Sequence, residues 1–306
     1  MVTWIIVGSV IGGLLVLFLI ALLIVYNIVF YSPKKWQQNN LELLDSISYQ
    51  GKDDLAREMI KRLVEIPYEE VNIQSYDLLR LHGYLYKNSE SDEVVIMFHG
   101  YRGGPHRDFS GGAYEMIKMN KNVILVDERA HGKSKGHSIT FGRKEQYDVL
   151  NWINYARSRF GQDIKITLVG ISMGGAIVLY AADKVSKDVK IIADAPYSRE
   201  KDIILYTMKN MKLPASFLYP FVHLASIIYS HARLVDDAVN NVANSQSKIL
   251  IIHGTGDSIV PYQSSERVYL ANKDRVQYEL FEGAEHGISY LVDTERYRKI
   301  ITDFMK

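Results

Sequence analysis

The most constraining feature of this chain is a strand–turn–helix pattern over residues 166–180. A β-branched apolar run leads into a turn in which Gly170, Ser172 and Gly174 spell Gly-x-Ser-x-Gly, and a small, apolar helical stretch follows. This arrangement is typical of a nucleophile elbow, where a serine occupies a sharp corner with its hydroxyl exposed. Glycines flank such a serine because a side chain at either position would meet the neighbouring strand or helix. We therefore interpret Ser172 as a catalytic nucleophile, the alternative being a structural Gly-Ser turn.

Short apolar runs recur along the rest of the chain and alternate with helical patterns. Before the first of them, residues 71–74 and 79–86 alternate around a Ser-Tyr-Asp turn, which predicts a hairpin. Continuous apolar runs separated by helices indicate a parallel sheet covered on both faces. The sequence thus predicts an α/β fold with a mostly parallel sheet and helices on both faces. The expected parallel strands are Val94–Phe98, Val123–Val126, Ile166–Val169, Val189–Ala193, Ile249–Ile252 and Val276–Phe281.

The N-terminal region reads as a membrane anchor. Residues 4–30 carry no charge and are almost entirely apolar side chains and glycine. A helix of this length more than spans a hydrocarbon core of about 30 Å, and Trp4 and Tyr26 suit the aromatic belts at its two ends. A cleaved signal peptide is the alternative, disfavoured by the long apolar run and by the lack of an Ala-x-Ala-like cleavage site. We expect residues 1–32 to form an uncleaved, single-pass transmembrane helix.

The side of the membrane is indicated only by Lys34 and Lys35, which follow the span directly. By the positive-inside rule they favour a cytoplasmic main domain. Gly8 and Gly12 have the spacing of a helix-dimerisation face, but glycine is common in membrane helices. The sequence therefore leaves the oligomeric state open.

Two segments interrupt the alternation of strands and helices. Residues 33–66 are polar with apolar residues at helical intervals, which predicts a helical lead-in to a main domain over residues 67–306. Residues 197–246 are far longer than a simple crossover, and insertions of this length are usually functional lids. The alternative is an extra helical layer packed on the body. If the segment is a cap over the site, Phe217 and Phe221 within it are candidate substrate-binding residues.

The partners that a serine nucleophile needs are present. A serine hydroxyl attacks well only when a histidine accepts its proton and a carboxylate orients that histidine. Asp257 lies on the loop after the run 249–252, and His286 lies between the last strand and the terminal helix. The chain order Ser172, Asp257, His286 is that of the α/β hydrolases. Asp194, which also follows a strand, is the alternative acid.

A candidate oxyanion hole follows the strand at residues 94–98. The loop reads His-Gly-Tyr-Arg-Gly-Gly, and we expect the backbone amides of Tyr101 and Met173 to hold a developing oxyanion. A glycine-rich loop can instead bind phosphate, but this one lacks the Lys-Ser/Thr ending and the spacing of a P-loop.

Cofactors, metals and nucleic acid are not expected. The 36 basic and 35 acidic residues nearly cancel, so no global field favours nucleic acid, and the absence of cysteine excludes thiolate metal sites, disulfides and a cysteine nucleophile. His131 and His137 lack a supporting carboxylate pattern for a metal. His99, His131 and His253 each precede a glycine and are interpreted as residues that structure their loops.

From about Val71 to the C-terminus the chain resembles the α/β-hydrolase-fold serine hydrolases. The stretch 127–134 is similar to the Asp-x-Arg-x-His-Gly-x-Ser sequence that many of them carry after the fourth strand. With its N-terminal anchor included, the chain resembles membrane-attached bacterial acyl hydrolases related to Bem46-like and ABHD-type proteins. The resemblance implies Ser172 as nucleophile, Asp257 as acid, His286 as base, and Tyr101 and Met173 as oxyanion donors. We expect the insertion at about residues 197–246 to be the helical cap of this fold. The sequence has His-Gly-Tyr where one lipase and esterase branch has His-Gly-Gly-Gly, which leaves the substrate class open.

Three functions remain in competition. The first is cleavage of an acyl bond, most simply a carboxylic ester, through an acyl-serine intermediate on a small-molecule substrate. The second is a peptidase or amidase with the same residues. The third is an inactive, membrane-tethered binding scaffold, against which the retention of Ser172, Asp257 and His286 argues.

Overall fold

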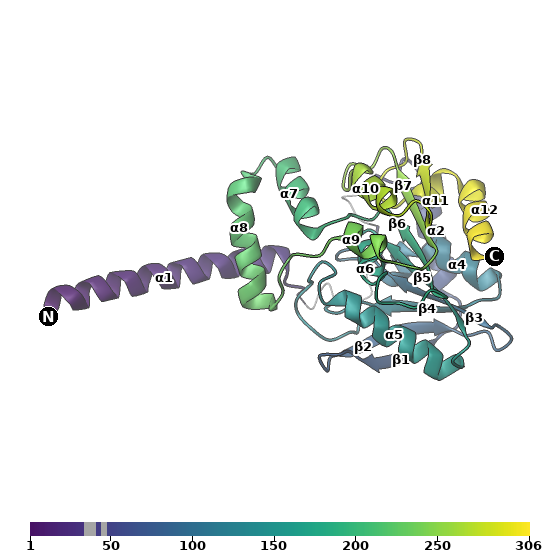
Figure 1. Cartoon of the computed structure of the whole chain (residues 1–306), viewed down its shortest axis with the longest axis horizontal. Helices are drawn as coiled ribbons and strands as arrows, with labels where there is room; N and C mark the ends of the chain where they lie inside the picture. The colour runs from purple at the N-terminus through teal and green to yellow at the C-terminus, as the bar shows by residue number, and fades with distance from the viewer. Residues whose placement is uncertain (34–40, 44–47) are drawn as a thin grey trace.

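The computed structural model describes residues 1–33, 41–43 and 48–306. At its centre lies an eight-stranded sheet with the order β1-β2-β4-β3-β5-β6-β7-β8 (Figure 1). β1 and β2 form the predicted hairpin, β2 pairs antiparallel with β4, and all further pairs from β4 to β8 are parallel. The strands are β1 Glu69–Gln74, β2 Arg80–Tyr86, β3 Glu93–Phe98, β4 Asn122–Asp127, β5 Lys165–Ile171, β6 Lys190–Asp194, β7 Ile249–Gly254 and β8 Val276–Phe281.

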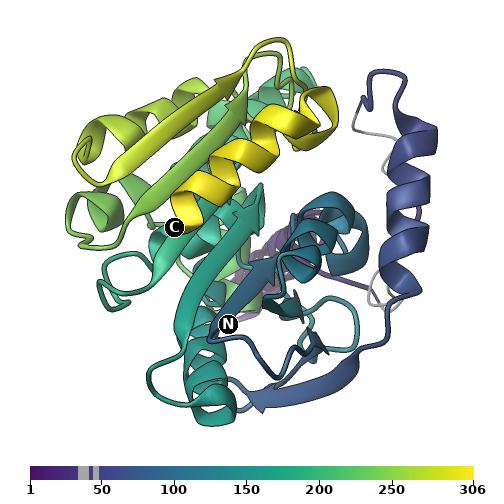
Figure 2. The same cartoon turned by 90° about the vertical axis from the view of Figure 1, so that its right-hand side faces the viewer.

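Helices cover both faces of the sheet, as the continuous apolar runs predict. Along β3, Val94 and Ile96 pack into the core on one face, whereas Val95 and Met97 pack into the core on the other. The first face carries α5 Glu145–Phe160, α6 Met173–Tyr180, α9 Ala238–Ala243 and α10 Gln263–Ala271. The second face carries α2 Asp53–Val64, α4 Ser110–Lys118 and α12 Thr294–Met305, which Figure 2 shows side by side, with α12 in yellow and α2 in dark blue. Two short helices, α3 Pro105–Asp108 and α11 Ser289–Val292, lie in loops.

The helix α1 Val2–Val29 projects away from the sheet (Figure 1). Its 28 residues are long and apolar enough to cross a membrane, a test that a signal sequence also passes. Of the predicted lead-in, the structure describes α2 as helical, while Lys34, Lys35 and much of the preceding segment lie outside the described residues. The insertion at residues 197–246 folds into α7 Glu200–Asn210, α8 Ala215–Ala225, the π-helical turn η2 Ser226–Ser230, and α9.

We expect the anchor to end at residue 32, but contacts with the main domain begin before that residue. Phe30 is fully buried and packs edge-on against Phe141 at 5.9 Å between ring centroids. The Phe30 carbonyl accepts a hydrogen bond from the Ile139 amide at 2.8 Å, and the Tyr26 hydroxyl lies 2.8 Å from the Ser138 hydroxyl. The last turn of α1 is therefore part of the main core, because its aromatic side chains fill space that the sheet and its loops leave open.

Candidate active site

The elbow at Ser172 has the backbone that its sequence predicts. Ser172 adopts φ 56° and ψ −115° between the end of β5 and the start of α6, a strained conformation for a residue with a side chain. A Cβ on Gly170 would lie 2.1 Å from the Gly174 carbonyl oxygen, and a Cβ on Gly174 would lie 1.8 Å from the Phe98 carbonyl oxygen. Both flanking glycines are thus required by close backbone approach.

The structure brings Ser172, His286 and Asp257 into one hydrogen-bonded chain. His286 Nε2 lies 2.8 Å from Ser172 Oγ, and His286 Nδ1 lies 2.7 Å from Asp257 Oδ2. The three residues follow β5, β8 and β7, whose carboxyl ends meet at one edge of the sheet. His286 and Asp257 are both buried. Such a chain can move a proton from the serine hydroxyl to the imidazole.

The Asp257 carboxylate is held in its charged form. Its Oδ1 accepts hydrogen bonds from the Ile259 and Val260 amides at 2.9 and 2.7 Å. Its Oδ2 also lies 3.1 Å from His253 Nε2. This nitrogen is the donor, because its other neighbour, the Val260 carbonyl, can only accept a hydrogen bond. Burial alone would raise the pKa of Asp257, but the hydrogen bonds from His253 and His286 outweigh burial and hold this pKa well below its ordinary value. His253, interpreted from the sequence as a loop residue, is thus also a direct partner of the acid.

Asp194, the alternative acid, is close to the elbow but has other partners. Its backbone carbonyl accepts the Ser172 amide at 2.8 Å, and its Oδ2 accepts the Tyr297 hydroxyl at 2.9 Å. The second oxygen, Oδ1, has no hydrogen-bond partner among the described residues. Burial raises the pKa of Asp194 to about 6. The geometry therefore favours Asp257 over Asp194 as the partner of His286.

The predicted oxyanion loop lies directly beside the serine. A tight turn, closed by a 2.9 Å hydrogen bond from the Gly103 amide to the Gly100 carbonyl, carries Tyr101. A Cβ on Gly100 would lie 3.5 Å from the Ser172 Cβ, which measures how near this loop approaches. Met173 is the first residue of α6, where amides lack intrahelical acceptors. Both residues expected to supply the donors therefore lie next to Ser172.

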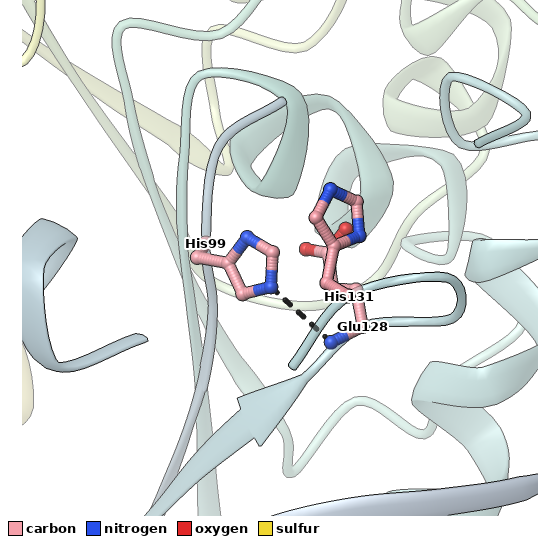
Figure 3. A group of neighbouring side chains, drawn as sticks. All are labelled: His99, Glu128 and His131. Carbon is pink, nitrogen blue, oxygen red and sulfur yellow. Dashed lines mark hydrogen bonds between the residues drawn. The ribbon is translucent and has the colours of Figure 1, made fainter. Parts of the chain in front are cut away.

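The stretch 127–134 supports this loop from behind. The Arg102 amide donates to His131 Nε2 at 3.1 Å. The Glu128 amide donates to His99 Nε2 at 3.2 Å, as Figure 3 shows. From its sequence, His131 is expected to structure its own loop, and its contact with the Arg102 amide extends that role to the predicted oxyanion loop. Nothing in the local sequence pattern indicates that contact.

The three side chains drawn in Figure 3 are close enough together to hold a metal ion. The ring nitrogens of both histidines are, however, already in use. His99 Nδ1 bonds the Gly100 carbonyl and His131 Nδ1 bonds the Arg129 carbonyl, while each Nε2 accepts a backbone N–H. Burial raises the pKa of Glu128 well above its ordinary value, which disfavours the charged carboxylate that would bind a metal ion. We therefore assign the cluster to loop support.

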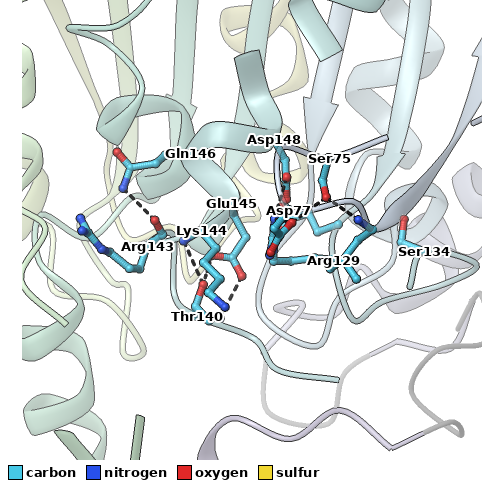
Figure 4. Close-up of polar contacts among 12 residues, drawn as sticks. Ser75, Asp77, Arg129, Ser134, Thr140, Arg143, Lys144, Glu145, Gln146 and Asp148 are labelled. Atoms are coloured by element: carbon cyan, nitrogen blue, oxygen red, sulfur yellow. Dashed lines mark hydrogen bonds and ion pairs between the residues drawn. The ribbon is translucent and has the colours of Figure 1, made fainter. Parts of the chain in front are cut away.

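An ion-pair network holds the same stretch against the sheet (Figure 4). Arg129 Nε lies 2.7 Å from Asp148 Oδ2, and its Nη1 lies 3.0 Å from Asp77 Oδ2. In the neighbouring loop, Thr140 donates both its amide and its hydroxyl to Glu145. Arg129 and Asp148 are both buried, so their ion pair fixes this stretch against α5.

A cavity of about 240 Å³ extends from Ser172 into the second face of the sheet. Its walls are mainly apolar and come from the strand ends and from α2, α4 and α12. Residues that represent these walls are Met97, Ile192, Ala56, Ile60, Met116 and Ile301.

Phe217 and Phe221, the expected substrate-binding residues, do not line this cavity. Phe221 packs edge-on against Phe18 of α1, and Phe217 is 68% exposed. The expectation is corrected for a physical reason: the apolar face of α8 finds its partner in α1. Figure 1 shows α8 crossing that helix, away from α2, α4 and α12.

The strand order, the strained serine corner and the positions of the candidate residues after the strands define an α/β-hydrolase fold. A family model described as Hydrolase_4, serine aminopeptidase S33, matches residues 89–222. The uncharacterized protein YqkD of Bacillus subtilis is 24% identical over 96% of this chain and 95% of its own. Protein bem46 of Schizosaccharomyces pombe is 24% identical over 78% of this chain and 76% of its own.

A structural comparison agrees with these relationships. The structure of the Pyrococcus furiosus esterase Pf2001 superposes with a TM-score of 0.65 at 26% identity, and covers 80% of this chain and 92% of that one. The chain belongs to the α/β-hydrolase superfamily, and it is a hydrolase with esterase-like structural neighbours.

Proposed function

We propose that this protein is a membrane-anchored serine hydrolase that cleaves carboxylic esters of small acyl substrates through an acyl-serine intermediate. The observation that carries the proposal is the hydrogen-bonded chain from Ser172 Oγ through His286 to Asp257 at 2.8 and 2.7 Å, beside an apolar cavity. An inactive scaffold has no need for a serine in a strained conformation whose hydroxyl is paired with a histidine.

In the proposed reaction, Ser172 Oγ attacks the substrate carbonyl carbon while His286 Nε2 takes the hydroxyl proton. The carbonyl oxygen becomes an oxyanion that accepts hydrogen bonds from the Tyr101 and Met173 amides. When the tetrahedral intermediate collapses, His286 returns the proton to the leaving alcohol. Water then attacks the acyl-serine and loses a proton to His286, and His286 passes that proton to Ser172 Oγ as the C–O bond to the serine breaks and the carboxylic acid is released. Asp257 stays ionised throughout and orients the imidazole.

The proposed substrate carries an apolar acyl chain. Each buried methylene contributes up to about 0.8 kcal/mol, so four additional methylenes contribute about 3 kcal/mol, or a hundredfold in affinity. The walls from α2, α4 and α12 are the surfaces that would gain this contact. α1, as a membrane span, would place the site near a bilayer that holds such chains.

A peptidase or amidase is the second candidate, favoured by the serine aminopeptidase description of the matching family model. The same proton transfers apply to an amide, since the leaving amine is also protonated by His286. A panel of acyl esters of increasing chain length, beside matched anilides, separates the two functions. Ester hydrolysis with kcat/KM rising from acetyl to octanoyl is the expected result. Preference for anilides or for a free α-amino group would favour the peptidase.

A fluorophosphonate probe tests the nucleophile without choosing a substrate. We expect stoichiometric labelling of the wild-type protein and none of Ser172→Ala. If the wild-type protein is folded by circular dichroism but is not labelled, the result would favour an inactive binding scaffold over an enzyme.

A further inference from the structure

The insertion carries exposed apolar side chains at the turn between α7 and α8. Met211, Leu213 and Phe217 are 64%, 41% and 68% exposed. Lys209, at the end of α7, and Lys212, in the turn, lie beside them in the sequence. Residues 209–217, called here the α7–α8 tip, contain no acidic residue. Exposed apolar groups gathered beside cations are typical of a surface that contacts a membrane.

The helix that follows the tip is packed on the expected membrane span. The Tyr229 hydroxyl donates to the Leu19 carbonyl at 2.8 Å, and Phe221 meets Phe18 at 6.2 Å between ring centroids. The rings of Tyr229 and Tyr26 lie 5.4 Å apart. Figure 1 shows α8 running across α1, so a bilayer perpendicular to α1 would contain α8 within its plane.

The length of α1 gives the depth of this crossing. At 1.5 Å per residue the helix is about 42 Å long, and a hydrocarbon core of about 30 Å takes about twenty residues. Counted from Val2, such a core ends near Leu22, and the contacts at Phe18 and Leu19 lie about 24–26 Å along the helix. α8 therefore contacts α1 inside the acyl-chain region, about 4–6 Å from its boundary with the headgroups on the side of the main domain. Before this crossing α1 has no buried residue, and its one buried residue is Leu22.

We propose that α8 and the α7–α8 tip form a second membrane-contacting element, bound to a phospholipid bilayer in the leaflet nearest the main domain. Leu213 and Phe217 insert among the acyl chains, while Lys209 and Lys212 lie at the lipid phosphates. A single span leaves a domain free to rotate about its axis, whereas an in-plane element at a distance from that axis restricts the rotation. The proposal rests on α1 being the membrane span and does not depend on the proposed chemistry.

This arrangement has a consequence for the active site. At the end of α1, the Val29 carbonyl accepts the Tyr101 hydroxyl and the Ile28 carbonyl accepts Arg102 Nη2, each at 2.8 Å. The oxyanion loop therefore caps the membrane helix, as side-chain donors often do at helix C-termini. With α8 seated in the leaflet, this edge of the sheet faces the bilayer, where acyl substrates are concentrated.

The chain contains no cysteine, so single cysteines report on one position each. Full-length Phe217→Cys is labelled with an environment-sensitive nitrobenzoxadiazole dye and reconstituted in vesicles of phosphatidylcholine and phosphatidylglycerol. Leu270→Cys is the matched control, because Leu270 is also an exposed apolar residue at 53% but lies near the end of α10. Leu213→Cys serves as a second reporter in case the first variant folds poorly, and circular dichroism checks all three.

We expect blue-shifted emission from the dye at residue 217, quenched by phosphatidylcholine that carries a doxyl group near the headgroup end of its acyl chain. The dye at residue 270 should emit as in water and resist this quencher. Equal, water-like emission from residues 217, 213 and 270 in vesicles that retain the protein would overturn the proposal. Because the readout is fluorescence, adding Ser172→Ala should leave it unchanged, so failure of the proposed chemistry is seen separately.

Discussion

The backbone of Ser172 stores strain that only a close-packed corner can maintain. Its positive φ sets the hydroxyl at the turn between strand and helix, with His286 2.8 Å away. We expect Ser172→Ala to lower kcat/KM by about four orders of magnitude or more, because the attacking atom is lost. His286→Ala should be about as damaging, since triad residues act as a unit. Melting temperature is the control: Ser172→Ala should melt within a few degrees of wild type, and retained ester hydrolysis would refute the assignment.

The two carboxylates near the elbow give opposite predictions. Asp257→Asn should lower kcat by about 10⁴, because the amide favours the wrong tautomer of His286. Asp194→Asn should retain activity within about tenfold, since Asp194 bonds Tyr297 and has no hydrogen bond to His286. Both variants are nearly isosteric, so steady-state kinetics on one ester compares them directly. An inactive Asp194→Asn beside an active Asp257→Asn would exchange their roles.

Asp194 also predicts a dependence of stability on pH. Burial raises its pKa from 3.8 to about 6, so the folded state binds the proton more tightly than the unfolded state. The free energy of unfolding should therefore fall as pH rises from about 4 to 6 and stay lower above that range. Asp194→Asn removes this ionisation, so its unfolding free energy relative to wild type should increase by about 2–3 kcal/mol between pH 3.5 and pH 7.5. Urea unfolding of both proteins at the two pH values measures the difference, and a pH-independent difference would contradict the assigned cause.

At the scale of elements, α2 lies outside residues 89–222, which the family model matches, yet it contributes to the candidate active site. Ala56 and Ile60 on α2 line the cavity that begins at Ser172. Ile60→Trp should fill its distal part, so kcat/KM for an octanoyl ester should fall about a hundredfold while that for an acetyl ester changes little. Ile60→Leu, which conserves volume, is the matched control. An equal fall for both esters would indicate general damage instead of a shortened acyl site.

The helices and strands were predictable from local sequence patterns, whereas the surfaces against which they pack were not. Continuous β-branched runs identify β3 to β8, and the glycine spacing around Ser172 identifies the elbow, because both signals depend on adjacent residues. The apolar face of α8 is equally visible in the sequence, yet which surface it covers depends on packing between distant segments. Phe221 therefore read as a pocket residue, although it contacts Phe18. Ile60, which does line the cavity, gave no chemical signal at all.

At the scale of the whole molecule, α1 and the hydrolase body share one core. Phe30 is fully buried against Phe141, and the carbonyls of Ile28 and Val29 are capped by the oxyanion loop. The last turn of α1 is thus a structural component of the domain, and α1 stands apart from the domain only before its crossing with α8. This division could not be read from hydropathy, because the apolar run continues unbroken through both parts.

That division predicts different results from two truncations. Removing residues 1–17 should leave a domain that folds and hydrolyses esters, because Phe18 and all later contacts with α8 remain. Removing residues 1–32 also deletes Phe30, and loss of a buried phenylalanine alone costs about 3–5 kcal/mol. At about 2–4 °C per kcal/mol for a domain of this size, the longer deletion should melt at least about 6 °C lower.

Point variants of the full-length protein separate packing from membrane attachment. Phe30→Ala should lower the melting temperature in detergent and reduce kcat, because Phe30 supports Phe141, whose ring stacks on Tyr101 at 5.1 Å. Ile20→Ala, within α1 and 48% exposed, should do neither. Differential scanning fluorimetry and ester kinetics in one detergent provide both readouts. If the longer deletion and Phe30→Ala both match the Ile20→Ala control, α1 is a simple tether, and the oxyanion loop holds its conformation without it.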